Sequence, residues 1–321
     1  MTIVEAMRRH FDIAPEAEVS LEANPGTVDA AHLEGLRRLG FNRISFGVQS
    51  FHDDELLLME RIHDRGEVED AYRWARAAGF ENVNLDLIYG LQGQTLEGWQ
   101  DNVERALDLG PDHLSLYALT LEEGTPLTRD VERGRSLGPD LDLQADMFEW
   151  TRDRMTRAGF AHYEVSNWAR LGRECRHNLV YWHNGDWLGI GAGAHSHLGN
   201  DRFATALSPS RYITLVQETA GSTEPLEMKQ VTFRDPGDRQ REMSETIILA
   251  LRLREGLSLP VFEERFGVGL EDAFAAPLGE TQRLGLTELV DGRLRLRDDA
   301  VLLGDEAFLR FLPDGSLVEP V

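Results

Sequence analysis

The sequence predicts an α/β protein built from parallel strand–helix units, and two observations support this. First, helical stretches repeatedly end in glycine and are followed by an apolar strand. The four closures are Leu39-Gly40-Phe41, Ala78-Gly79-Phe80, Leu109-Gly110-Pro111 and Ala158-Gly159-Phe160. Glycine just past a helix end adopts the left-handed conformation at little cost. Second, strand, helix and strand recur at spacings of about 30–50 residues, which is typical of βα units that curl into a barrel or an open sheet.

The predicted elements alternate along the first half of the chain. We expect strands at 19–23, 43–48, 83–88, 113–119 and 161–165. We expect helices at 29–39, 54–62, 67–78, 95–109 and 141–158.

Polar residues mark the carboxyl ends of four predicted strands: Glu22, Gln49, Asp86 and residues 117–120. A single such residue often only caps a strand. The carboxyl ends of parallel strands converge on the ligand, however, so four of them in register predict a binding site.

The second half of the chain has a different character. Residues 189–194, Gly-Ile-Gly-Ala-Gly-Ala, loosely match a dinucleotide fingerprint but lack a clear strand before them and a helix after them. We therefore expect a tight turn in which backbone approaches backbone or a flat ligand. We expect a first domain over 1–218, a linker over 219–239 and a second domain over 240–321.

The second domain is predicted to be small and mainly helical. Helices are expected at 241–254, 259–266 and 278–284, and a hairpin is expected to turn at Asp291-Gly292. Helices followed by a hairpin resemble a winged-helix fold.

Composition excludes several classes of function. The 321 residues include 33 Lys and Arg against 56 Asp and Glu, a net charge of −23 that disfavours binding to nucleic acid phosphates. No apolar run of about 18 residues predicts a membrane span, and no signal peptide is evident, so we expect a cytoplasmic protein. The single cysteine, Cys175, excludes an intrachain disulfide and an iron–sulfur cluster held by cysteines of this chain alone.

Residues 177–182, His-Asn-Leu-Val-Tyr-Trp, form the most distinctive local stretch. A neutral imidazole can ligate iron, and the rings of Tyr181 and Trp182 offer a flat apolar surface for a macrocycle. A histidine among aromatic residues can equally be a packed, hydrogen-bonded side chain. Cys175 can likewise be a second soft ligand or a small buried hydrophobe.

Glu22, Arg61 and Asp86 form a charged set that is costly to bury without partners. A zwitterionic ligand with an amine, a carboxylate and ribose hydroxyls would satisfy all three side chains. An internal network of salt bridges is the alternative.

Three segments resemble one protein family. They are residues 20–25 (Ser-Leu-Glu-Ala-Asn-Pro), 41–50 (Phe-Asn-Arg-Ile-Ser-Phe-Gly-Val-Gln-Ser) and 84–91 (Asn-Leu-Asp-Leu-Ile-Tyr-Gly-Leu). The family is that of radical S-adenosylmethionine (SAM) proteins related to oxygen-independent coproporphyrinogen III oxidase. The resemblance implies a partial (β/α)6 barrel with a small, winged-helix-like C-terminal domain. It implies contacts to SAM for Glu22, Gln49, Arg61, Asp86 and Thr120.

His177, Asn178, Tyr181 and Trp182 match the HNxxYW motif of a haem-chaperone branch of this family, which the decarboxylating oxidase branch lacks. The resemblance implies that these four residues bind haem, with His177 as a candidate iron ligand.

The sequence departs from the family at its beginning. Family members start with a strand, a CxxxCxxC loop that holds a [4Fe–4S] cluster, and a glycine-rich second strand, and none of these is present here. We therefore expect a barrel that lacks its first strands, no protein ligands for the cluster, weakened SAM binding and no assignable catalytic residue.

The expected function is that of a haem chaperone that binds haem and transfers it to client haemoproteins. One alternative is a radical SAM oxidoreductase that acts on coproporphyrinogen III in porphyrin biosynthesis. The other is an inactive remnant or interaction module. Homodimerisation is left open.

Overall fold

The computed structural model describes residues 3–218 and 228–313. The chain divides into two compact units, Met1–Glu174 and Cys175–Val321, each with its own sheet structure. This division falls inside the range 1–218 that we expected to form one domain. Strand β9, Val231–Pro236, occupies part of the expected linker, and residues 219–227 lie outside the described part of the chain. The predicted domain bounds therefore remain a prediction.

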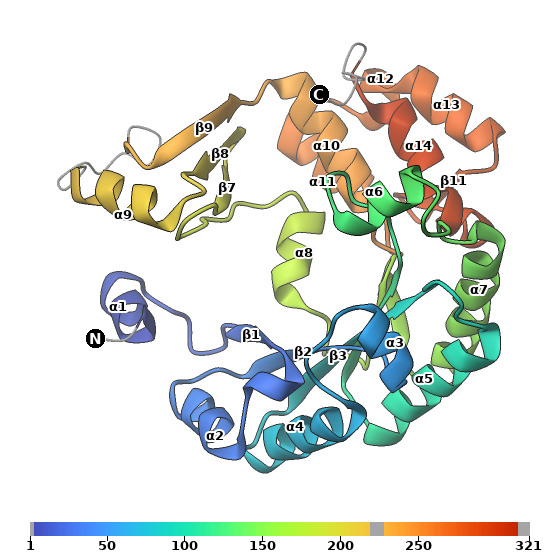
Figure 1. Cartoon of the computed structure of the whole chain (residues 1–321). Helices are drawn as coiled ribbons and strands as arrows, with labels where there is room; N and C mark the ends of the chain where they lie inside the picture. Colours follow the sequence, from blue (N-terminus) through green and yellow to red (C-terminus); the bar gives the residue numbers. More distant parts are fainter. Residues whose placement is uncertain (1–2, 219–227, 314–321) are drawn as a thin grey trace. The chain divides into compact units, whose positions relative to one another are not determined.

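The first unit contains a six-stranded sheet in the order β1-β2-β3-β4-β6-β5 (Figure 1). The strands are β1 Ser20–Ala23, β2 Arg43–Gln49, β3 Asn82–Tyr89, β4 His113–Ala118, β5 Ala161–Glu164 and β6 Asn167–Ala169. The pairings from β1 to β4 are parallel, as the repeated strand–helix units predict. The short β6 was not predicted; it runs antiparallel to both β4 and β5 and separates them, because the chain turns back after Glu164.

The helices of this unit begin and end with recognisable capping residues. They are α1 Ile3–His10, α2 Ala30–Arg38, α3 Asp53–Leu58, α4 Arg65–Ala77, α5 Leu96–Leu109, α6 Pro126–Glu132 and α7 Leu141–Arg157, with a 3-10 turn η1 at Pro25–Thr27. Five of them begin at a side chain that accepts a backbone N–H of the first turn: Asp29, Asp64, Thr95, Thr125 and Asp140. The four predicted closing glycines all have positive φ, which confirms these C-caps.

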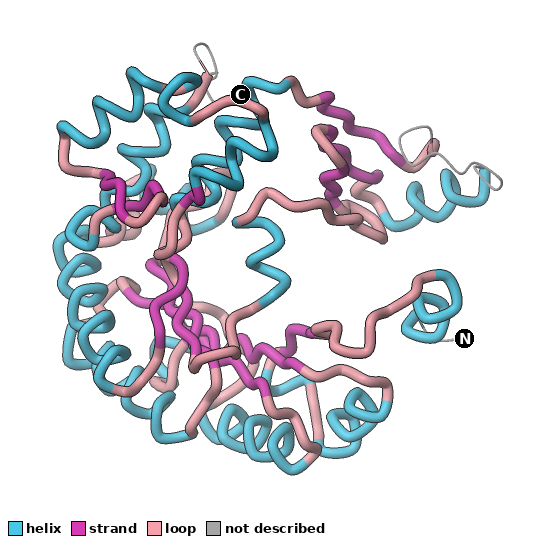
Figure 2. Tube along the Cα trace, turned by 180° about the vertical axis from the view of Figure 1, so that it is seen from behind, coloured by secondary structure: helices cyan, strands magenta, loops and turns pink. Residues whose placement is uncertain are grey.

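Alternate residues give this sheet one apolar and one polar face. The apolar face comprises Ile44, Phe46, Val83, Leu85, Leu87, Leu114 and Leu116, all buried. Helices α2, α4, α5 and α7 run along the strands (Figures 1 and 2) and contribute buried apolar residues such as Leu33, Val68 and Val103. The opposite face carries Arg43, Ser45, Asn84, Asp86, His113 and Ser115. Because successive side chains of a strand point to opposite faces, the same strands contribute apolar residues to the core and polar residues to the candidate site.

The second unit begins with α8, Arg176–Trp182, and continues into an antiparallel sheet in the order β7-β8-β9. Its strands β7 and β8 span His195–Leu198 and Asp201–Thr205, and α9 spans Pro209–Glu218. A Cβ atom on Gly189 would lie 2.0 Å from the carbonyl oxygen of His195. The glycine-rich stretch is therefore a close approach of backbone to backbone, as expected.

The C-terminal part of this unit is mainly helical, with a small antiparallel sheet in the order β10-β12-β11. Its elements are α10 Arg239–Leu251, β10 Leu257–Ser258, α11 Leu259–Phe266, α12 Leu270–Ala273, α13 Ala275–Arg283, β11 Thr287–Val290, β12 Arg293–Leu296, η3 Asp298–Leu303 and α14 Gly304–Phe311. Asp291 and Gly292 have φ of 50° and 74°, which confirms the predicted two-residue turn. A core that includes Ile247, Phe262 and Phe311 joins these elements. Among the described helices, none is long and apolar enough to cross a membrane.

Candidate functional site

Two of the predicted site residues, Glu22 and Asp86, lie on the polar face of the first sheet. Glu22 of β1 is opposite Ser45 of β2, and Ser45 is opposite Asn84 of β3. The Ser45 hydroxyl donates a hydrogen bond to Asp86 Oδ2 at 2.8 Å, and the Asn84 amide donates to Asp86 Oδ1 at 2.7 Å. The two carboxylates therefore share one face of the sheet with hydroxyl and amide donors around them.

The electrostatics of this face favour a cationic or hydroxyl-bearing ligand. Burial raises the pKa of Asp86 above its ordinary value, hydrogen bonds from Ser45, Ser115 and Asn84 oppose the rise, and the charge of Glu22 adds to it. Neither Glu22 nor Asp86 forms an ion pair within residues 3–218 and 228–313. The alternative of an internal salt-bridge network therefore does not account for these two carboxylates.

A hydrogen-bonded chain behind Asp86 fixes the orientation of Asn84. His113 Nδ1 lies 2.7 Å from Asn84 Oδ1, and His113 Nε2 lies 2.8 Å from the Tyr163 hydroxyl. Burial, with a contribution from the charge of Arg43, lowers the pKa of His113 well below its ordinary value, so the imidazole is neutral at physiological pH. Its Nδ1–H donates to Asn84 Oδ1, and the Asn84 NH2 group consequently points to Asp86, Ser45 and Ser115. The sequence analysis did not predict this series of hydrogen bonds. Polar residues at alternate positions of the apolar strands are a signal that could have indicated it.

Gln49 has an unusual backbone conformation at the end of β2. Its φ is 67°, and it follows an irregularity in the β2–β3 pairing. The next residue, Ser50, is buried and hydrogen-bonds to Glu55 and Asn102, which holds the loop in place. A positive φ in a residue other than glycine persists only where neighbouring contacts enforce it, and such positions cluster at ligand sites.

Arg61 lies in a loop and not in a helix, which corrects the prediction of a helix over 54–62. Helix α3 ends at Leu58 because Glu60 has a φ of 54° and the Arg61 N–H bonds back to the Leu56 carbonyl at 2.9 Å. The Arg61 Nε is buried and has no hydrogen-bond partner among the described residues, which fits a polar ligand group.

Thr120 is exposed after β4. Within the described ranges, no hydrogen bond or ion pair joins Arg61 or Thr120 to Glu22 or Asp86.

The raised pKa of Asp86 predicts the sign of a pH effect on stability. The folded protein binds the proton of Asp86 more tightly than the unfolded chain does. The free energy of unfolding should therefore fall as pH rises from the ordinary pKa of 3.8 through the raised one. In Asp86→Asn this fall should be absent and stability at pH 7 should be higher, since the amide oxygen can still accept from Asn84 and the amide NH2 group can donate to the Ser45 hydroxyl. Urea unfolding between pH 4 and pH 8 measures the pH dependence of the free energy of unfolding and its value at pH 7. Asp146→Asn, at an exposed position, is the control, and an unchanged pH slope in Asp86→Asn would contradict the prediction.

In the second unit, His177 and Tyr181 face each other one turn apart on α8. The Tyr181 hydroxyl lies 2.9 Å from His177 Nε2, and the rings meet edge to face with centroids 4.9 Å apart. Tyr181 also contacts the Trp187 ring at a centroid distance of 4.7 Å. His177 is exposed and Asn178 is half-buried.

Trp182 ends the same helix. The guanidinium of Arg252 lies 4.7 Å from its ring centroid, a cation–π contact. The indole Nε1 is buried without a hydrogen-bond partner among the described residues. A cavity of about 450 Å³ lies beside α8 and is lined by Arg176, Leu179, Val180, His183, Gly185 and Asp186. Its volume falls in the range of small-molecule sites.

The residues present do not fit a [4Fe–4S] cluster. Cys175, the only cysteine in the sequence, is buried at the start of α8. No group of three or more His, Cys, Asp or Glu side chains that could hold a metal ion occurs in the described part of the chain. A cluster of this kind needs cysteine thiolates that this chain does not supply.

Sequence comparisons agree with this architecture. The profile of the Radical SAM superfamily matches residues 2–106, and that of the HemN C-terminal domain matches residues 238–303. The protein named Heme chaperone HemW of Mycobacterium tuberculosis H37Rv is 40% identical over 305 residues, covering 94% of this chain and 75% of that protein. The chain belongs to the HemW family of radical SAM proteins. The HemW of Bacillus subtilis is 35% identical over 298 residues, covering 92% of this chain and 76% of the relative.

The fold of this HemW family member is also that of a solved structure. Coproporphyrinogen III oxidase (HemN) from Escherichia coli superposes with a TM-score of 0.80 at 24% identity, covering 98% of this chain and 74% of that chain. At this identity the likeness shows the fold alone. It confirms the expected radical SAM barrel architecture with a small C-terminal domain.

Proposed function

We propose that this HemW family member is a haem chaperone, which binds haem at α8 and passes it to client haemoproteins. The observation that carries the proposal is the placement of His177, Tyr181 and Trp182 on one short helix in a family whose relatives are named heme chaperones. The cavity beside this helix is lined by other α8 residues, among them Leu179 and Val180, and not by the four motif residues, so the proposal rests on the motif and not on the cavity.

In this proposal His177 is the iron ligand. Its imidazole is exposed, so iron can approach it, but its Nε2 already shares a hydrogen bond with the Tyr181 hydroxyl. Ligation requires that bond to break, at a cost of about 0.5–1.5 kcal/mol. The hydrogen bond between Tyr181 and the imidazole can form again when haem leaves. A ligand with a competing internal partner suits a carrier that must release its cargo.

The polar face of the first sheet is proposed to hold SAM. Glu22 suits the SAM amine, Arg61 suits its carboxylate, and Asp86 suits the ribose hydroxyls. Among the described residues, the buried Arg61 Nε has no hydrogen-bond partner and the carboxylates of Glu22 and Asp86 form no ion pair, which supports this assignment. Gln49 and Thr120 complete the proposed set. Because the single cysteine does not fit the [4Fe–4S] cluster, no step of the proposed function is assigned to that group.

The role of His177 is tested by haem titration of the purified chain, followed by visible absorbance. The parent chain should bind haem, and His177→Ala should raise the Kd at least tenfold, which corresponds to about 1.4 kcal/mol. His195→Ala, which removes another exposed histidine, is the matched control and should leave the Kd unchanged. An unaltered titration for His177→Ala would exclude His177 as the ligand, whereas equal losses in both variants would indicate a general folding effect.

The second candidate, expected from the family resemblance, is an oxidoreductase that acts on coproporphyrinogen III, and the shared fold is consistent with it. Product analysis separates the two functions, because only the oxidoreductase forms protoporphyrinogen and releases carbon dioxide. An inactive remnant would show neither turnover nor affinity for tetrapyrroles. Homodimerisation and a cytoplasmic location remain predictions.

A further inference from the structure

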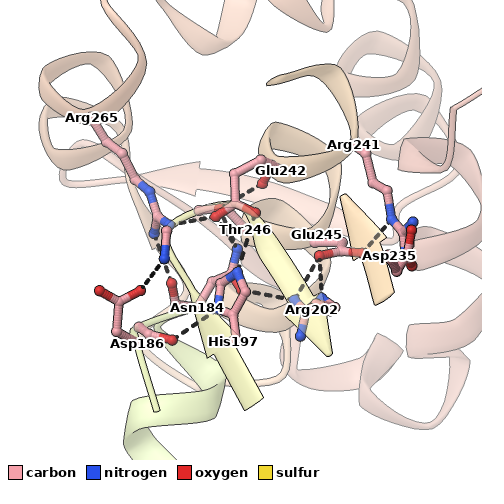
Figure 3. A network of polar contacts seen from close by, with 12 residues as sticks. Asn184, Asp186, His197, Arg202, Asp235, Arg241, Glu242, Glu245, Thr246 and Arg265 are labelled. Atoms are coloured by element: carbon pink, nitrogen blue, oxygen red, sulfur yellow. Dashed lines mark hydrogen bonds and ion pairs between the residues drawn. The ribbon is translucent and has the colours of Figure 1, made fainter. Parts of the chain in front are cut away.

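A buried polar cluster joins the end of α8 to helices α10 and α11 (Figure 3). We call its central residues, Asn184, Glu242 and Arg265, the clamp. Asn184 is fully buried, and Glu242 is 3% exposed. All three residues belong to the second unit, which also contains α8.

Asn184 terminates α8 through its backbone and anchors it through its side chain. Its φ is 48°, its N–H bonds to the Tyr181 carbonyl at 2.9 Å, and the Gly185 N–H bonds to the Val180 carbonyl at 2.9 Å, which is a Schellman ending. Glycine is the usual residue at such a position. The Asn184 amide donates to Glu242 Oε1 at 2.9 Å and to Thr246 Oγ1 at 3.0 Å, and its oxygen accepts from Arg202 at 3.1 Å.

Arg265 and His197 donate hydrogen bonds to two backbone carbonyls just beyond α8, those of Asn184 and Gly185. Arg265 Nη1 donates to the Asn184 carbonyl at 3.0 Å, and Arg265 Nη2 pairs with Glu242 Oε1. His197 Nδ1 donates to the Gly185 carbonyl at 3.0 Å, and its Nε2 lies 3.5 Å from Glu242 Oε2. The carboxylate of Glu242 thus binds partners on α11 and at the end of α8, and it lies close to His197 on β7.

Two physical facts make this cluster a positioning device. Helix α8 has seven residues, none of them fully buried, and a helix this short has little stability of its own. Buried ion pairs are also weak evidence for stability, because their desolvation offsets their attraction; their geometry restricts the chain to one arrangement instead. The position of α8 therefore depends on what holds its end.

We infer that Asn184, Glu242 and Arg265 are positioning residues for the proposed haem site. They fix the C-terminal end of α8 to α10 and α11, so the segment matched by the HemN C-terminal domain profile determines where His177 and Tyr181 stand. This inference rests on the proposed function, because it takes α8 as the haem-binding helix.

Asn184→Gly tests the clamp. Glycine tolerates the positive φ and preserves the helix ending, but it removes the side-chain anchor. We expect amide exchange at residues 180–185 to accelerate at least tenfold relative to α13, and haem Kd to rise at least fivefold. The control is Asp291→Gly, which makes the same kind of change at an exposed turn position with a φ of 50°. The control should change neither quantity by more than about twofold.

The outcomes separate the clamp from the proposed function. If the parent chain binds no haem, the proposed function fails, and unchanged exchange at 180–185 in Asn184→Gly would still overturn the clamp. If the parent binds haem and the variant exchanges fast but binds haem equally well, the positioning role is wrong. Should Asn184→Gly not fold, Arg265→Lys and Arg265→Met replace it. Lysine keeps the charge beside Glu242 and should lose less haem affinity than methionine, and equal affinities in the two variants would overturn the inference.

Discussion

Reconstitution of the purified chain with iron and sulfide is expected to leave it without a [4Fe–4S] cluster. One buried cysteine, Cys175, cannot replace the cysteine thiolates that ligate such a cluster, and the described residues contain no alternative metal-binding group. The expected amount of cluster per chain is therefore zero, and not merely a reduced amount. Visible absorbance together with iron and sulfide content per chain measures it.

Stoichiometric iron and sulfide with the broad absorbance of a cluster would contradict this expectation. A cluster bridged by Cys175 from several chains is the one other route, and Cys175→Ser is the variant that detects it. Native mass analysis of the parent and of Cys175→Ser separates a bridged cluster from one held within a single chain.

The second large effect concerns SAM. Charge-assisted hydrogen bonds between SAM and Glu22, Arg61 and Asp86 are worth roughly 1.5–3 kcal/mol each when well made, and less where water competes. We expect a Kd no better than about 1 mM, which is about −4.1 kcal/mol. Joining an N-terminal segment with a CxxxCxxC loop should restore the cluster and bring the Kd to the micromolar range, roughly a thousandfold change.

Calorimetry on both forms of the chain decides the SAM prediction. Asp86→Asn in the extended form is the control, since it should weaken SAM binding without affecting the cluster. Micromolar SAM binding by the present chain would mean that its own side chains suffice, and the expectation of weakened binding would then be wrong.

Much of the fold could be predicted because its signals are local. A glycine after a helix and an apolar run after that glycine mark each strand–helix unit, and the parallel strands β1 to β4 lie where these signals place them. Among the features that were missed, two have clear physical reasons. The three residues of β6 are too few for a periodic pattern, and the end of α3 depends on the positive φ of Glu60, which no residue type at that position indicates.

The candidate site could be predicted only in part. Strand ends locate Glu22 and Asp86 on one face, but the donors that orient Asp86 come from the interiors of three strands. The clamp could not be predicted from local sequence, because Asn184 and Glu242 are 58 residues apart, and Glu242 and Arg265 are 23 residues apart. Their partnership exists only once α10 and α11 have packed.

Haem transfer to an apo-haemoprotein is the reaction that a haem chaperone must perform, and it can be measured directly. The chain is loaded with one equivalent of haem and mixed with increasing concentrations of the acceptor, and transfer is followed by the change in visible absorbance. We expect a rate that rises with acceptor concentration, because the acceptor takes haem from an exposed site on α8. A rate that is independent of acceptor concentration and equal to spontaneous haem loss would show passive release and would contradict a chaperone function.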